Sequence, residues 1–154
     1  EVSRNHVRLG DMLNQRGRIS AAVLEYRRAL GRSPHSAVVM NRLGSSLARR
    51  GAPLEGAEVL KKTEELYPDY GPTYKYLALI YQGLEELSLA ADYYLKAIRI
   101  NPFDPSLHAG RMVVLKALGR AAEAGEEEAL LKKLLPGRMN EIDDDPSHTG
   151  DADE

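Results

Sequence analysis

The sequence contains no cysteine, no tryptophan and only one phenylalanine among its 154 residues. Without cysteine the chain forms neither a disulfide bond nor a zinc–thiolate site, and it offers no thiol nucleophile. It also lacks an apolar run of about 18 residues, so it predicts no membrane insertion. No signal-peptide pattern stands at its beginning. We expect a soluble chain, cytoplasmic or, if a signal was removed, periplasmic. Because it begins at Glu1, we expect a piece of a longer protein or a processed chain.

Residue patterns that carry catalysis are missing as well. The four histidines lie far apart in the sequence, at His6, His35, His108 and His148. The chain has no glycine-rich phosphate-binding loop and no serine nucleophile elbow. Clustered glutamates, such as the run Glu126–Glu128, occur where helix surfaces or turns are predicted, and glutamates are rarely buried. The sequence therefore predicts no catalytic residue, no metal site, no cofactor and no enzymatic activity.

Charge is unevenly distributed along the chain. The segment 141–154 holds seven of the 23 acidic residues and no lysine or arginine. The segment 1–140 consequently carries 21 basic against 16 acidic side chains, a net charge of +5. This excess is modest and shows no interleaved basic and aromatic stripe, so we expect no nucleic-acid partner. The composition of the segment 137–154 predicts an acidic, disordered tail.

What the sequence does contain is an internal repeat with a fixed interval. A constant interval of 34 residues separates four prolines: Pro34, Pro68, Pro102 and Pro136. The same interval separates four small residues: Ala22, Gly56, Ala90 and Ala124. The glycines Gly17, Gly51 and Gly119 follow it too, with Glu85 in the third place. A fixed period of about 34 residues indicates stacked supersecondary units. The four units are residues 3–36, 37–70, 71–104 and 105–138.

Each unit contains two stretches with apolar residues three or four positions apart, which is typical of amphipathic helices. In the first unit this pattern assigns to buried stripes Val7, Leu9, Leu13, Ala22, Leu24, Tyr26 and Ala29. Small residues at Gly10, Gly44 and Gly56 predict close approach of the paired helices. Ser20 and Ser88 are predicted helix caps. Asp104 followed by Pro105 predicts another helix start.

The pattern resembles the tetratricopeptide signature. The first unit matches through Leu9, Gly10, Leu13, Ala22, Tyr26, Ala29 and Pro34, and the third through Tyr74, Leu77, Ala78, Tyr81, Ala90, Tyr94, Ala97 and Pro102. The resemblance covers residues 3–136, and its style is similar to that of bacterial members. It implies an all-α fold, a right-handed α-solenoid of four helix-turn-helix repeats, and binding of another protein or peptide as an adaptor or scaffold.

The fourth unit departs from the signature, with Arg111 and Glu128 at normally apolar positions. A terminal repeat has no neighbour on one side, so its outer face must be polar. We expect a C-terminal cap with Ala124, Leu130, Leu131, Leu134 and Leu135 inside and Glu126, Glu127, Lys132 and Lys133 outside. The first unit has no such cap, which leaves open self-assembly into homo-oligomers through that repeat.

By resemblance to the family, the first helix of each unit lines a concave groove. The groove residues that we predict to bind a partner are Arg4, Arg8, Asn14, Asn41, Arg42, Arg49, Lys75, Tyr76 and Lys116. They predict a polar, basic groove suited to an extended and acidic peptide. Asn41 offers both a donor and an acceptor to a peptide backbone.

A subset of the family binds chaperone C-termini through a two-carboxylate clamp. The matching positions here are Val7, Asp11, Arg42, Pro72 and Tyr76, and four of the five differ in kind, so we reject the clamp. Tyrosines crowd the third unit, and the extra ones, Tyr67, Tyr70, Tyr76 and Tyr93, are interpreted equally as a binding anchor or as packing. A further alternative is an accessory repeat region of a larger bacterial envelope peptidase-like protein.

Overall fold

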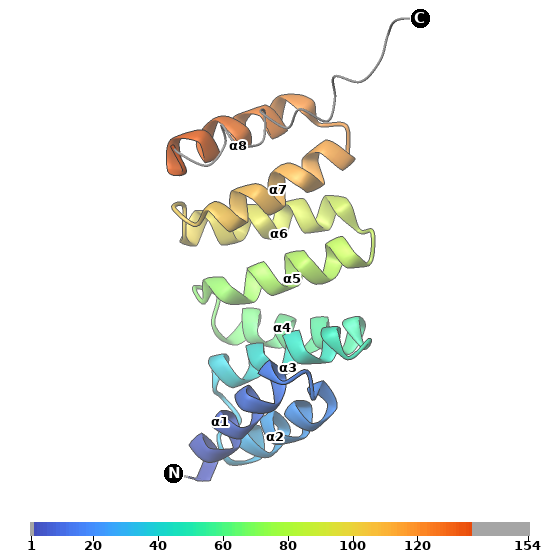
Figure 1. The fold of residues 1–154 in the computed structure, drawn as a ribbon, viewed down its shortest axis with the longest axis vertical. Helices are drawn as coiled ribbons and strands as arrows, with labels where there is room; N and C mark the ends of the chain where they lie inside the picture. The colour runs from blue at the N-terminus through green and yellow to red at the C-terminus, as the bar shows by residue number, and fades with distance from the viewer. Residues whose placement is uncertain (1, 137–154) are drawn as a thin grey trace, which may run out of the picture.

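The computed structural model describes residues 2–136, and the regular structure in this range is entirely α-helical. The helices are α1 (Val2–Gln15), α2 (Ile19–Arg32), α3 (Ala37–Arg49), α4 (Pro53–Leu66), α5 (Gly71–Gly83), α6 (Leu87–Ile100), α7 (Pro105–Ala117) and α8 (Ala121–Leu134). They form helix pairs that stack from α1 and α2 at one end to α7 and α8 at the other (Figure 1). The predicted all-α repeat solenoid is confirmed. The predicted acidic tail, 137–154, lies outside the described residues.

The spacing of the helices follows the period of the sequence. The second helices of the pairs begin at Ile19, Pro53, Leu87 and Ala121, each one repeat interval after the last. Every second helix packs against its own first helix, and α2, α4 and α6 also pack against the first helix of the next pair. In addition α3 contacts α5 directly. First helices therefore form one layer of the solenoid and second helices the other.

The turn inside each pair is closed by one recurring backbone hydrogen bond. The amide N–H of Arg18 donates to the carbonyl oxygen of Leu13 at 2.8 Å, and the same bond joins Ala52 to Leu47, Glu86 to Tyr81 and Arg120 to Leu115. The residue before each donor has a positive φ: Gly17, Gly51, Glu85 and Gly119, with φ of 74°, 93°, 62° and 73°. This is the Schellman arrangement, in which glycine is favoured because it has no Cβ.

The prediction that Ser20 and Ser88 cap their helices is wrong. The N-cap residues of α2 and α6 are Arg18 and Glu86, and neither side chain forms a capping hydrogen bond. The serines instead occupy the second position of each helix. The backbone bond of the preceding turn fixes the helix start two residues earlier, so no side-chain cap is required to define it.

Side-chain caps occur between the pairs instead. The Oδ1 atom of Asp104 accepts a hydrogen bond from the backbone N–H of Ser106 at 2.9 Å, with Pro105 at the first helical position. This confirms the start that the sequence predicts for α7. At α3 the hydroxyl of Ser36 accepts from the N–H of Val39 at 3.4 Å.

Glycines bring the helices of a pair into close contact, as predicted. A Cβ atom on Gly44 would lie 2.6 Å from Cγ of Leu60 and 3.0 Å from the carbonyl oxygen of Gly56. A Cβ on Gly10 would lie 2.6 Å from the ring of Tyr26. These positions have no room for a side chain, so the sequence requirement for glycine comes from packing rather than from backbone conformation.

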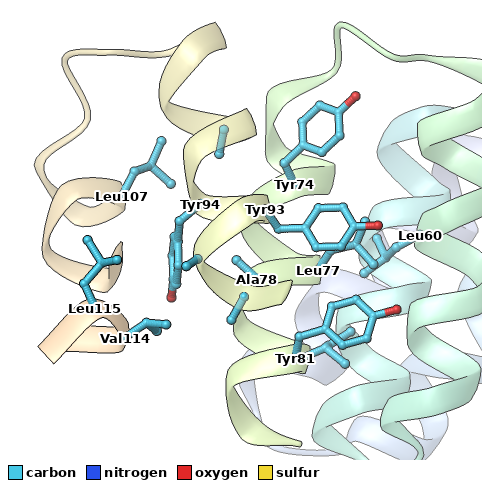
Figure 2. Close-up of a cluster of buried hydrophobic side chains, with 14 of the residues drawn as sticks. Leu60, Tyr74, Leu77, Ala78, Tyr81, Tyr93, Tyr94, Leu107, Val114 and Leu115 are labelled. Atoms are coloured by element: carbon cyan, nitrogen blue, oxygen red, sulfur yellow. The ribbon is translucent and has the colours of Figure 1, made fainter. Parts of the chain in front are cut away.

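The largest hydrophobic cluster extends from α4 to α8, and tyrosines form a prominent part of it. Tyr93 lies between Tyr74 and Tyr81, with ring centroids at 6.4 Å and 5.5 Å and nearly parallel planes for Tyr81 (Figure 2). The three hydroxyl groups point to the same side. Nζ of Lys96 lies 4.7 Å from the Tyr93 centroid. Tyr93 is therefore a core residue, which favours packing over a binding anchor for this tyrosine.

Burial differs from the prediction at four other positions. Leu9 is 44% exposed, because no helix precedes α1 in the described structure and the equivalent Leu43 packs on α2. Leu24, expected in a buried stripe, is 55% exposed on the outer face of α2. In α8, Glu127 is buried and Leu130 is 42% exposed, the reverse of the prediction, since Glu127 pairs with Arg111 and His108 of α7.

Candidate partner-binding surface

The first helices of consecutive repeats are linked side by side by polar contacts. Three hydrogen bonds join them: Arg49 to Asn14, Thr73 to Asn41, and Lys75 to Ser106, with lengths of 2.8, 3.0 and 2.7 Å. They connect α1 to α3, α3 to α5, and α5 to α7. The four helices thus present one continuous surface, called here the first-helix surface, and it carries the predicted groove residues.

Two of the predicted groove cations are neutralised by neighbouring carboxylates. Nη1 of Arg42 lies 3.0 Å from Oδ2 of Asp11, and Nζ of Lys75 lies 3.9 Å from Oδ2 of Asp104. The hydrogen bond from the Ser106 hydroxyl, together with Lys75, lowers the pKa of Asp104 and keeps it ionised. These pairs make the surface less basic than its count of lysines and arginines suggests.

Asn41 is not presented to the surface. Only 3% of the residue is exposed, and its Oδ1 accepts a hydrogen bond from the hydroxyl of Thr73. Its Nδ2 forms no hydrogen bond with the residues that the structure describes. Asn41 therefore holds α3 against α5, and contact of this side chain with a peptide is not supported by its burial.

The remaining predicted residues lie at the two ends of the surface. Arg4 and Arg8 are exposed on α1. Lys116, in the last turn of α7, lies 3.7 Å from Oε2 of Glu128 on α8. Glu128 occupies the repeat position that Tyr26 and its apolar equivalents fill in the other repeats, so this pair belongs to the polar C-terminal end of the stack.

A pocket of about 600 Å³ opens on the first-helix surface between α3, the start of α4, and α5. Its lining is Ser45, Ala48, Arg49, Gly51, Pro53, Tyr76, Leu79, Ile80, Gly83 and Leu84. Arg49 is the only charged residue among them, and most of the walls are apolar. Leu79 is 47% exposed at this site. We call this the larger pocket; its volume lies in the range of ligand-binding cavities, about 300–1,000 Å³.

A second pocket, the smaller pocket, of about 350 Å³ lies between α5 and the start of α7. Its lining is Gly71, Pro72, Lys75, Tyr76, Ala97, Ile100, Asn101, Asp104 and Leu107. It is more polar than the larger pocket because Lys75, Asn101 and Asp104 reach it. Tyr76 lines both pockets and separates them. The two pockets therefore follow one another along α5 as neighbouring subsites.

A family model described as "Tetratricopeptide repeat" matches residues 77–104, which comprise the second half of α5 and all of α6. The chain is similar to the tetratricopeptide-repeat family over this stretch, and its helix pairs repeat the same architecture across the described residues. The family and the fold support its interpretation as a protein-interaction scaffold. Proteins with this repeat are typically interaction modules rather than enzymes. No curated protein matches the sequence.

Solved structures of tetratricopeptide-repeat proteins share the fold. The MamA protein is 22% identical with a TM-score of 0.79, over 91% of this chain and 76% of that chain. Pseudomonas aeruginosa pilF is 22% identical with a TM-score of 0.78, over 85% and 60%. The first repeat domain of Spaghetti (RPAP3), bound to the HSP90 peptide SRMEEVD, is 15% identical with a TM-score of 0.73, over 77% and 94%. At these identities the likeness establishes the fold alone.

Three residues that the sequence predicts for the groove, Arg49, Lys75 and Tyr76, line the two pockets, but the sequence analysis did not predict the larger pocket itself. Repeat position placed Leu79 near the groove, and its apolar character in that place was the available signal. Gly83 is equivalent in the repeat to Arg49 of the preceding unit. The absence of a side chain at Gly83 was a second indication of a pocket at this place. Pro53 of α4 also lines the larger pocket. Its position there depends on how the helix pairs stack, which the repeat pattern of the sequence does not indicate.

The part of the chain that the structure describes contains no helix long and apolar enough to cross a membrane. In the same range no group of three or more histidine, aspartate or glutamate side chains is placed to hold a metal ion. His6 and His108, which share a repeat position, each bond to a glutamate of their own repeat.

Proposed function

We propose that this tetratricopeptide-repeat chain is an interaction module that binds an extended segment of a partner protein on its first-helix surface. The observation that carries the proposal is the pair of adjoining pockets along α5, which share Tyr76. Concave, mostly apolar sites with a few polar groups are typical of ligand-binding surfaces. An extended segment suits two subsites in a row, because its side chains can enter pockets while its backbone bonds to polar groups at the rim.

One structural neighbour supports this use of the fold, since the RPAP3 repeat domain was solved with a bound peptide, SRMEEVD. In the present chain the partner contacts that we propose are Arg49, Lys75 and Tyr76, with Arg42 held by Asp11 beside them. Arg4, Arg8 and Asn14 extend the same surface along α1, and Lys116 lies at its other end. Tyrosine favours such a role because it offers a large contact area with few rotamers to restrict.

The test is selection of binders from a random decapeptide library on the immobilised chain, followed by fluorescence anisotropy with the selected peptides. The variant Gly83→Gln places a side chain at the mouth of the larger pocket, and a Cβ there meets no atom within 4 Å, so folding is preserved. The matched control is Gly31→Gln in α2, where a Cβ is equally free of contacts. We expect Gly83→Gln to weaken binding and Gly31→Gln to leave it unchanged. Equal binding by both variants, or no selected peptide, would contradict the proposal.

A second candidate is self-assembly through α1, favoured by apolar side chains that no helix covers in the described structure. Val2 and Met12 are each 50% exposed and Leu9 is 44% exposed. Static light scattering across concentration tests it: the mass should rise with concentration for the natural chain and stay constant for Leu9→Arg. A constant mass for the natural chain would exclude this candidate.

A further inference from the structure

We infer that the first-helix surface recognises a segment in which a bulky apolar residue lies within about three residues of an aspartate or glutamate. The inference rests on the proposed function and names the chemistry of its ligand. The apolar residue occupies the larger pocket, and the carboxylate binds Arg49. The larger pocket has mostly apolar walls, a positive charge at its rim and the smaller pocket beside it.

The walls of the larger pocket favour an apolar side chain. Ile80 is buried behind the pocket, and Leu79 leaves nearly half of its surface exposed in front of it. The hydroxyl of Ser45, which also lines the pocket, already donates to the carbonyl oxygen of Arg42 at 3.2 Å. Burying an apolar side chain in the pocket removes these surfaces from water without leaving a polar group unpaired.

Arg49 stands at the rim of this pocket with its positive charge uncompensated. Nη1 donates to the neutral Asn14 at 2.8 Å, and Arg49 forms no ion pair within residues 2–136. This distinguishes it from Arg42 and Lys75, which face Asp11 and Asp104. A planar guanidinium with free donors matches a carboxylate in geometry and charge. An acidic residue next to the apolar anchor therefore complements the site.

The larger and the smaller pocket are close enough for one short segment to enter both. On α5 the smaller pocket is lined from Gly71 to Tyr76 and the larger from Tyr76 to Gly83. Their midpoints are thus about six residues apart, or roughly 9 Å along a helix. An extended or polyproline II segment covers about 3.1–3.4 Å per residue, so about three residues span both pockets. The mixed charges of the smaller pocket, Lys75 and Asp104, suit a polar residue or the peptide backbone.

The inference is tested on the decapeptides selected from the random library. The selected sequences should share a leucine, isoleucine, methionine or phenylalanine with an aspartate or glutamate within three positions. Replacing the apolar residue by alanine, or the acidic residue by asparagine, should each weaken binding roughly tenfold or more, as expected for a lost anchor or a lost charged hydrogen bond. The measurement is anisotropy of the labelled peptides with the full chain.

A charge exchange gives the decisive arm of the test. The Arg49→Glu variant should bind the acidic peptide more weakly than the natural chain does. It should bind more tightly the same peptide with lysine in place of the acidic residue. The matched control is Arg99→Glu, which makes the same change in net charge at an exposed position on α6. If Arg49→Glu and Arg99→Glu weaken peptide binding equally, the inference is overturned and the proposed function still holds. The same conclusion follows if the selected peptides contain no acidic residue but their binding is still weakened by Gly83→Gln. Failure to select any peptide overturns both.

Discussion

Single residues distinguish the end repeats from the central ones. His6 and Glu25 are 19 residues apart and joined at 2.7 Å, and His108 and Glu127 are 19 residues apart and joined at 2.6 Å. The same two repeat positions hold Met40 with Val59, and Tyr74 with Tyr93, in the central repeats. One structural position therefore carries an apolar pair where repeats are covered on both sides and a polar pair at the ends of the described stack.

The pair in the last repeat is part of a buried charge network. Nε2 of His108 lies 2.8 Å from the carbonyl oxygen of Pro102, which can only accept, so this nitrogen carries a proton. Oε2 of Glu127 lies 2.6 Å from Nδ1 of the same ring, and Oε1 accepts a hydrogen bond from the guanidinium of Arg111. Glu127 therefore lies between the guanidinium of Arg111 and the imidazole of His108 in the interior of the fourth repeat.

Glu127→Gln should destabilise the chain by about 3 kcal/mol, because removing one member of a buried ion network leaves its partners uncompensated. Urea unfolding monitored by circular dichroism gives the free energy of unfolding. The neighbouring Glu126→Gln is the control, since Glu126 is exposed and its replacement should stay within about 0.5 kcal/mol. A similar, small effect of both substitutions would show that Glu127 is not essential to the fourth repeat.

Glu85→Gly should stabilise the chain, because Glu85 occupies a left-handed backbone conformation with φ of 62°. The three equivalent turns use glycine, and a non-glycine residue in this conformation costs about 1 kcal/mol. The greater entropy of glycine in the unfolded chain offsets part of that gain. The urea midpoint should rise for Glu85→Gly and fall for the control Glu58→Gly, which puts glycine in the middle of α4. A fall in both would argue against strain at Glu85.

Among the elements, the glycines inside helices differ in whether a side chain would fit. Gly44 is enclosed by Leu60 and Gly56, whereas a Cβ on Gly125 in α8 meets no atom within 4 Å. Gly44→Ala should therefore destabilise by about 1–3 kcal/mol through overpacking. Gly125→Ala should stabilise by about 0.5–1 kcal/mol through helix propensity. Opposite shifts of the thermal midpoint are expected, and shifts of the same sign would contradict the assigned helix contacts.

The sequence predicted the helices well because every repeat imposes the same packing, so the repeat period specifies pairs, turns and core together. It failed where a residue depends on which elements surround it. Leu9 has the signature of a core residue but no described helix before it, and Glu127 looks like a surface charge until Arg111 and His108 are seen to face it. The larger pocket likewise results from three helices meeting, which periodicity does not encode.

For the whole molecule, histidine–glutamate pairs occur in the two end repeats of the described stack, and apolar pairs replace them in the central repeats. The tyrosine column of Tyr74, Tyr81 and Tyr93 lies on α5 and α6 (Figure 2), which stand in the middle of the stack (Figure 1). Both pockets are lined by residues of α5. An end repeat has a neighbour on one side only, so polar partners within the repeat replace the contacts that stacking supplies elsewhere. The proposed binding surface is thereby built on the part of the solenoid that is packed from both sides.

Stability of the whole array should decrease in acid, because several carboxyl groups have pKa values below their ordinary ones. The hydrogen bond from His6, with the charge of Arg28, lowers the pKa of Glu25 from its ordinary 4.5, and the bonds from Ser106 lower that of Asp104 from 3.8. A lowered pKa in the folded state means that the unfolded chain binds more protons in this range. The stabilisation is therefore complete above about pH 5 and is lost as the pH falls through the folded pKa values.

The expected result is a urea midpoint that stays level from pH 7 to about pH 5 and then falls toward pH 3. Glu25→Gln removes one of the responsible groups, so its midpoint should start lower at pH 7 and fall less steeply in acid. Glu58→Gln is the matched control, since Glu58 is exposed on α4 and forms no ion pair with the described residues. Its curve should parallel that of the natural chain. If the Glu25→Gln curve also runs parallel, the contact between α1 and α2 through His6 and Glu25 does not contribute to stability in solution.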